Sequence, residues 1–134
     1  MLSKIVRRLL SLLFTLGVYD KHYKLVWDGE MVSLNQLYSQ KHWSARSAMK
    51  NKYIKIFTTL LLQAKVKPMR ELSIVLFYSS RMDVDNCVCG CKFLSDAVKG
   101  KYLEDDSAKF YKALFMIHDS ELPKGTYEYH LIGR

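Results

Sequence analysis

Several features that would place this chain in a common class are missing from its sequence. No uninterrupted apolar run approaches the roughly 20 residues that a membrane-spanning helix needs. There are only three cysteines, all within residues 87–91, and their spacing is not the C-x₂-C of structural zinc sites. An odd number also argues against a disulfide framework. We therefore interpret them as small packing residues in a reducing cytoplasm rather than as metal ligands.

Acidic residues are scarce in the first part of the chain. Residues 1–81 hold 14 Lys and Arg against 4 Asp and Glu, a charge of 14 − 4 = +10. Residues 82–134 hold 7 against 9, a charge of 7 − 9 = −2, which leaves +8 overall. A metal-dependent nuclease needs such a division, because cations hold the polyanion and carboxylates hold the metal. The alternative is a basic protein whose charges only keep it dispersed.

The carboxylates that are present crowd into one stretch, between Arg81 and Lys109. Crowded carboxylates repel one another unless a cation lies between them, so the stretch is either a solvated loop or a metal site. A helix is predicted from Asp85 to Val98, and Gly100 is its expected stop. The acidic residues of the stretch are Asp83, Asp85, Asp96, Glu104, Asp105 and Asp106.

One face of the predicted helix carries charge. At about 100° per residue, Asp85, Cys89, Lys92 and Asp96 share a direction. Asp96 lies about 16 Å along the helix axis from Asp85, so the two cannot bind one ion. We expect Asp96 to support the site, by orienting Lys92 for example. A plain ion pair between Lys92 and Asp96 is the alternative.

These residues resemble the RusA-like Holliday junction resolvases. The resemblance rests on the motif DVDN at 83–86, on Lys92 and Asp96 four apart, and on DDS at 105–107. Further upstream, SLNQLY at 33–38 and the pair His42-Trp43 are similar to the family's N-terminal motif, and the likeness covers residues 23–132. In the best-known form of the family the lysine follows DxDN by one helical turn. Here it follows by two turns, and Cys89 occupies the nearer position.

The resemblance implies a homodimeric, Mg²⁺-dependent endonuclease of a bacterial or phage-infected cell that cuts four-way DNA junctions by paired nicks. Asp83, Asp85 and Asp106 would be the metal ligands, and Lys92 would offer charge to the scissile phosphate. Asn86, Asp96 and Asp105 would support the site. The rivals are a nuclease for flaps or forks, a DNA-binding protein without catalysis, and a basic protein held at a membrane surface.

DNA contacts are expected from two neighbouring segments. The polar, aromatic segment 31–43 is predicted to be a loop whose aromatic side chains either stack on DNA or pin the loop to the core. A helix predicted over 44–64, capped by Ser44, carries cations without nearby acidic partners, which favours phosphate contact over a merely solvated face. The candidate DNA-binding residues are Asn35, Tyr38, His42, Trp43, Arg46, Lys50 and Arg81.

The predicted fold is α+β, with a small mixed sheet of about four strands and two main helices. Strands are expected at 23–27, 71–78, 110–117 and 127–132, the second and third buried and the last alternating between apolar and polar. Residues 21–134 would form the nuclease domain. Residues 1–20 form an amphipathic helix outside the resemblance, with Ile5, Leu9, Leu12, Leu13 and Leu16 as its apolar side. That helix is expected to pack on the domain or on a dimer partner. A membrane contact through residues 1–18 and a signal peptide are the alternatives.

Overall fold

A four-stranded mixed sheet organises the chain, and the computed structural model describes all of residues 1–134. The strands are β1 (Lys21–Trp27), β2 (Leu72–Ser79), β3 (Tyr111–His118) and β4 (Thr126–Gly133). Their order is β1-β4-β2-β3. The β1/β4 and β4/β2 pairs are antiparallel, whereas β2 and β3 are parallel. The predicted α+β class and mixed sheet are confirmed.

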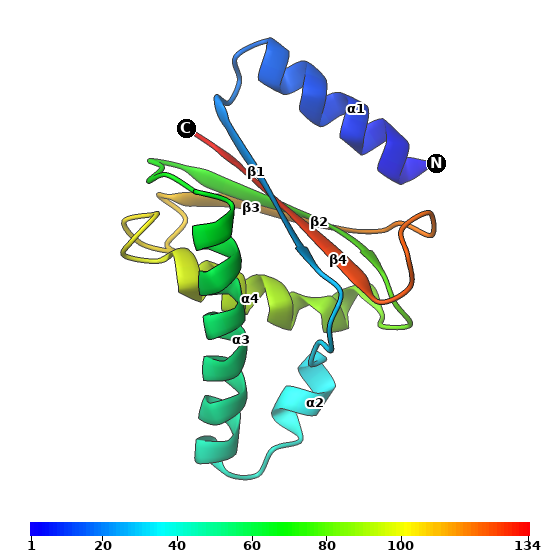
Figure 1. Cartoon of the computed structure of the whole chain (residues 1–134), viewed down its shortest axis with the longest axis vertical. Coiled ribbons are helices and arrows are strands. Elements are labelled where there is room, and N and C mark those ends of the chain that lie inside the picture. Colours follow the sequence, from blue (N-terminus) through cyan, green and yellow to red (C-terminus); the bar gives the residue numbers. More distant parts are fainter.

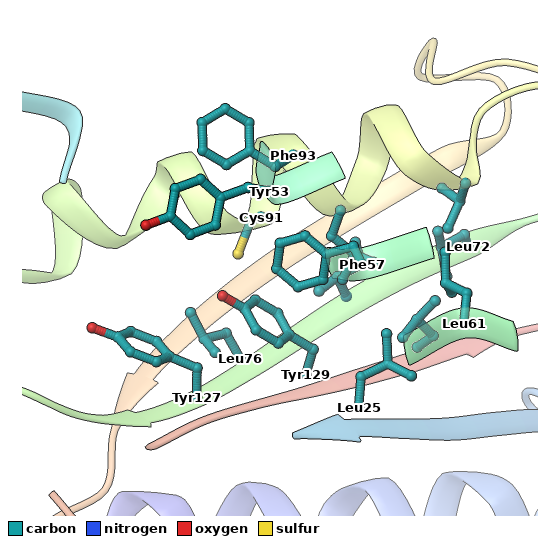
Figure 2. Packing of buried hydrophobic residues seen from close by; sticks show 14 of the residues in the cluster. Leu25, Tyr53, Phe57, Leu61, Leu72, Leu76, Cys91, Phe93, Tyr127 and Tyr129 are labelled. Carbon is teal, nitrogen blue, oxygen red and sulfur yellow. The ribbon is translucent and has the colours of Figure 1, made fainter. Parts of the chain in front are cut away.

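Helices α3 (Trp43–Gln63) and α4 (Val88–Val98) cover one face of this sheet (Figure 1). Aromatic side chains fill the space between, where Phe57 of α3 meets Tyr129 of β4 edge to face at 5.1 Å. Tyr53 stacks on Phe93 of α4 at 5.4 Å, so the two helices also pack on each other. Figure 2 shows these rings together with Cys91, whose sulfur points from α4 toward the sheet.

Three expectations about the elements are wrong. Strand β3 is an edge strand and not a buried one, and Phe115 on it is 56% exposed. The segment predicted as a loop contains a short helix, α2 (Leu34–Tyr38), which a capping box between Ser33 and Gln36 stabilises. Helix α3 begins at Trp43, and no side chain caps it, so Ser44 is not its cap. No helix in the structure combines the length and apolarity that crossing a bilayer requires.

Helix α1 (Leu2–Thr15) covers the opposite face of the sheet (Figure 1), but not with the side that was predicted to be apolar. Leu10 packs against Val75, Phe77 and Ile117 in a small second core. Ser3 is buried and Arg7 is half-buried, as a sheet-facing side requires. The predicted apolar side lies in solvent instead, apart from half-buried Leu13. The helix does pack on the domain, and its orientation is the reverse of the prediction.

A chain of charged and polar groups beneath α1 explains this orientation. The Arg7 guanidinium lies 2.6 Å from Oε1 of Glu128 and 3.2 Å from Oδ2 of Asp119, two buried carboxylates. It also lies 4.0 Å from the centre of the Phe77 ring, a cation–π contact. Buried carboxylates are costly unless paired, so Arg7 holds the helix in this rotation.

Two histidines extend the chain of polar groups. His130 Nε2 is 2.5 Å from the same Glu128 oxygen, and His22 Nε2 is 2.7 Å from His130 Nδ1. If His130 donates to the carboxylate through Nε2, its Nδ1 must accept from His22, so the His130 ring is neutral. Burial lowers the pKa of both histidines. Burial alone would raise the pKa of Glu128, but hydrogen bonds from Arg7 and His130 outweigh it and lower that pKa.

The same groups explain the sequence of β4. Its polar residues Glu128 and His130 suggested a strand with one face in water, yet β4 is central and buried on both sides. Tyr127, Tyr129 and Leu131 enter the main core beneath α3 and α4. The alternating residues of β4 therefore point to an apolar core on one face and to the buried polar groups beneath α1 on the other.

Candidate active site

The DVDN motif lies where β2 leaves the sheet. After Ser79 the chain turns, and Asp83 precedes a short 3₁₀ helix, η1 (Val84–Cys87), which continues into α4. Cys87 is 1% exposed and anchors the motif in the core, while Asp83 and Asp85 face solvent. The motif therefore begins four residues beyond the end of β2, at that end of the sheet.

The predicted charged face of α4 is partly wrong. Cys89 is buried, whereas Lys92 is exposed. The 3₁₀ turn winds more tightly than an α-helix, so extrapolating an ideal α-helix from Asp85 gives the wrong phase for Cys89. Asp85 and Lys92 are exposed, whereas the Asp96 side chain is only 15% exposed.

Helix α2 docks on the DVDN motif. The backbone N–H of Asn35 donates to Oδ1 of Asn86 at 3.2 Å, which joins segments 51 residues apart. A shallow hollow opens between them, lined by residues of both segments, including Ser33, Gln36 and Asp83, together with Arg81. The two segments that carry the family resemblance are therefore neighbours in the fold.

The remaining carboxylates lie among lysines. Lys92 Nζ is 3.2 Å from Oδ1 of Asp96 and 3.6 Å from Oδ2 of Asp106. Lys99 Nζ is 3.5 Å from Oδ1 of Asp106 and 3.4 Å from Oδ1 of Asp105. The Lys92–Asp96 ion pair weighed in the sequence is thus present. Asp106 is held between two ammonium groups.

Asp96 and Asp105, which were expected to support the site, also have partners within the chain. Lys50 of α3 lies 3.3 Å from Oδ2 of Asp96, so Asp96 ties α3 to α4. The backbone N–H of Asp106, followed by Lys99, lowers the pKa of the Asp105 carboxyl. Asp105 and Asp106 of the acidic turn are therefore paired with lysines of the chain.

The structure does not bring Asp83, Asp85 and Asp106 together as ligands of one ion. No three His, Cys, Asp or Glu residues lie close enough together to hold one ion. The physical reason is that α4, about 16 Å long, separates the DVDN motif from the acidic turn. Carboxylate oxygens have the chemistry that Mg²⁺ prefers. Asp106 would have to leave Lys92 and Lys99 before it could share an ion with the other two.

The predicted DNA-binding residues lie on the surface around α2 and the start of α3. Tyr38 is 70% exposed and Trp43 is 75% exposed, so neither pins this segment to the core. His42 and Arg46 are exposed as well, and Arg46 forms no ion pair. Lys50 is the exception, because Asp96 neutralises it. These side chains are accessible to a polyanion.

A second hollow, which the sequence did not reveal, lies beside Arg81. It is lined by polar residues alone, among them His118, Ser120 and Lys124. Parallel strands β2 and β3 both end here, and the ends of parallel strands are common ligand sites. Arg81 and Ser80 border this hollow and the one at Asp83. The parallel pairing, which the sequence did not disclose, is what brings Lys124 and Arg81 together.

The cysteines take no part in the site. All three are buried and free. Burial raises the pKa of Cys87 to about 11 and also raises the pKa of Cys89 and Cys91. They remain thiols near neutral pH, as packing residues do.

Comparison with models of protein families gives no match to this chain, and comparison with curated proteins gives none either.

Proposed function

We propose that this chain is a Mg²⁺-dependent endodeoxyribonuclease that resolves four-way DNA junctions by paired phosphodiester hydrolysis, as a homodimer. The observation that carries the proposal is the contact between Asn35 and Asn86. It joins the SLNQLY and DVDN segments, on which the resemblance to the RusA-like resolvases rests. If the resemblance of these two motifs to the family were due to chance, there would be no reason for both to line the same hollow.

The surroundings suit a nucleic acid backbone. Arg81 and Lys124 form no ion pair and line a polar hollow next to Asp83. On the other side, Tyr38 and Trp43 offer exposed rings for stacking. A DNA strand crossing the DVDN motif would therefore meet cations on one side and aromatic rings on the other.

The chemistry assigned to the site follows from its residues. Bound Mg²⁺ would supply an activated water and would offset the charge that develops on the phosphate. Asp83 and Asp85 are the proposed ligands, since they are exposed and free of lysine partners. Lys92 is proposed to face the scissile phosphate, because more than half of its side chain is exposed despite two carboxylate partners.

One observation favours a second function, binding of branched DNA without cleavage. Asp106 is occupied by Lys92 and Lys99, so the chain neutralises the carboxylate that a third metal ligand would need. In that case the lysines complete a structural ion-pair cluster. The two functions share a DNA surface and differ only in the presence of a metal.

Binding and cleavage should therefore be measured separately on a synthetic four-way junction, a fork, a flap and a linear duplex. We expect the wild type to bind the junction most tightly in EDTA and to cut it in Mg²⁺. Asp83→Asn should keep that affinity and lose at least about 100-fold in cutting rate. The matched control is Asp20→Asn, an exposed carboxylate at the opposite end of the sheet.

The outcomes separate the candidates. Undiminished cutting by Asp83→Asn would remove the proposed site. Junction binding by a wild type that cuts nothing in Mg²⁺ or Mn²⁺ would establish the second function instead. Asp106→Asn, compared with Asp105→Asn, then tests the third ligand. If Asp106→Asn loses cutting and Asp105→Asn keeps it, Asp106 leaves its lysine partners and binds the metal.

A further inference from the structure

The polar hollow at the ends of β2 and β3 is a cavity of its own beside the one at the DVDN motif. Its volume of about 450 Å³ falls within the roughly 300–1,000 Å³ of small-molecule sites. No apolar and no acidic side chain lines it. The polar and cationic residues in its lining include Ser80, Arg81, His118, Ser120 and Lys124. A cavity with this lining suits a small anion.

Backbone contacts join the two walls of the hollow. Tyr78 and His118 are partners in the parallel ladder of β2 and β3, and their rings meet edge to face at 5.3 Å. The backbone N–H of Gly125 donates to the carbonyl oxygen of Ser79, which ties the turn before β4 to the end of β2. In Figure 1 this turn, drawn in orange, lies at the same end of the sheet as the segment that follows β2. The shape of the hollow therefore depends on the backbone rather than on flexible side chains.

The cations of the hollow have no carboxylate partner. Arg81 and Lys124 are exposed and form no ion pair. Asp119 and Glu121, the carboxylates of the turn before β4, are instead paired with cations of α1. Two positive charges therefore remain available to a ligand.

Backbone donors add to these charges. No carbonyl oxygen of the chain accepts from the N–H groups of Ser80, Arg81, Ser120 and Lys124. The N–H groups next to two of them, in Met82 and Glu121, do find side-chain acceptors. Unpaired backbone N–H groups beside cations are typical donors of anion sites. The same four residues therefore bring both the lining and spare donors.

We propose that this hollow binds a phosphate monoester, a terminal phosphate group with three free oxygens. Such a group carries roughly −1.5 to −2 charges near pH 7, which two unpaired cations match. A phosphodiester inside a continuous strand has one charge and two free oxygens, so it would leave a cation and several donors without a partner. The source is either the phosphorylated end of a DNA strand or a free phosphate such as that of a nucleotide.

The proposed nuclease function does not contain this ligand, because contact with a continuous strand needs only phosphodiesters. The two are also independent in a test, since monoester binding is measured without DNA and without metal. If the chain does cut DNA, hydrolysis of a phosphodiester leaves one strand end as a monoester, and the hollow is where that end would be held.

An NMR titration of the full chain in EDTA, at constant ionic strength, compares methyl phosphate with dimethyl phosphate. Methyl phosphate should move the amide signals of Ser80, Ser120 and Lys124 to saturation, with a dissociation constant on the order of 1 mM for so small a ligand. Dimethyl phosphate, which differs by one methyl group and one charge, should bind at least about fivefold more weakly.

Charge-removing variants test the cations. Arg81→Gln and Lys124→Gln should each raise the dissociation constant of methyl phosphate at least about fivefold. The matched control is Lys112→Gln, which removes an exposed lysine at the other end of β3 and should leave that constant unchanged. Circular dichroism checks that all three variants fold.

The source of the phosphate follows from two oligonucleotides in EDTA, one with a terminal phosphate and one with hydroxyl ends. Tighter binding of the phosphorylated one that Lys124→Gln removes assigns the strand end as the ligand. Equal binding of both, together with saturable binding of inorganic phosphate, assigns a free phosphate.

Three results would overturn the proposal. The first is the absence of saturable shifts with methyl phosphate up to about 20 mM, well above the expected constant. The second is equal affinity for dimethyl phosphate, which would make the hollow a contact for any phosphate. The third is methyl phosphate binding that both Arg81→Gln and Lys124→Gln leave intact. Each of these results leaves the cutting measured with Asp83→Asn as it is, so the two proposals fail separately.

Discussion

Removing the Arg7 side chain tests the buried ion pairs beneath α1. In Arg7→Met the alkyl part of the side chain stays and the charge goes. Glu128 and Asp119, whose side chains are 9% and 6% exposed, then lose their cation. Removing one partner of a buried pair costs about 3–5 kcal/mol. The Arg7 side chain is 34% exposed, so water replaces part of the interaction, and we expect a loss of about 2–4 kcal/mol.

The loss should depend on pH in a definite direction. Hydrogen bonds from Arg7 now keep the pKa of Glu128 and Asp119 low, against the effect of burial. Without Arg7, burial raises these pKa values. A carboxyl with a raised pKa favours folding at low pH and loses that contribution as the pH rises through the folded pKa. The destabilisation should therefore be larger at pH 7.5 than at pH 5.

Urea denaturation followed by circular dichroism measures both effects. Arg8→Met is the matched control, because Arg8 is exposed and forms no ion pair, and it should change stability by less than about 0.5 kcal/mol. A loss below about 1 kcal/mol in Arg7→Met at pH 7.5, or an equal loss at both pH values, would refute the reasoning.

Other perturbations probe the core, the histidines and the polar hollow. Tyr129→Phe removes a buried hydroxyl that has no hydrogen-bond partner. The free energy of unfolding should therefore stay constant or rise by at most about 1 kcal/mol, and the melting temperature should not fall. Gly90→Ala would set a methyl group 2.4 Å from that hydroxyl and should cost about 1–3 kcal/mol, less in the Tyr129→Phe background. The wild type should melt at lower temperature as the pH falls below about 6.5, since burial lowers the pKa of His130 and its histidine neighbour and the unfolded chain binds more protons. Lys124→Gln should reduce the salt dependence of DNA binding by about one unit of slope, whereas Lys112→Gln, at the far end of β3, should not.

The sheet could be predicted from the sequence because each strand has a recognisable local pattern of apolar residues. Residues 71–78 form an apolar run bounded by charge, and β2 occupies 72–79. Glycine at position 100 was the expected stop of the preceding helix, and its φ of +82° is what such a stop requires. Boundaries and element types of this kind depend on neighbouring residues alone.

The orientation of α1 could not be predicted in this way. Hydropathy alone placed the leucines inward and Arg7 outward. Arg7 instead turns toward the sheet and is half-buried, and its partners Asp119 and Glu128 lie 112 and 121 residues away along the chain. A buried carboxylate pair that needs a cation outweighs several exposed leucines, and no local pattern discloses such a pair.

The grouping of Asp83, Asp85 and Asp106 as metal ligands stays a prediction, because the structure does not bring the three together. Asp106 was grouped with the other carboxylates because it is close to them in the sequence. Sequence distance does not tell which cations lie beside a carboxylate in the fold. Lys92 of α4 and Lys99, which follows α4, lie 3.6 Å and 3.5 Å from carboxylate oxygens of Asp106. Three carboxylates near one another in sequence are therefore weaker grounds for a metal site when lysines are interleaved with them.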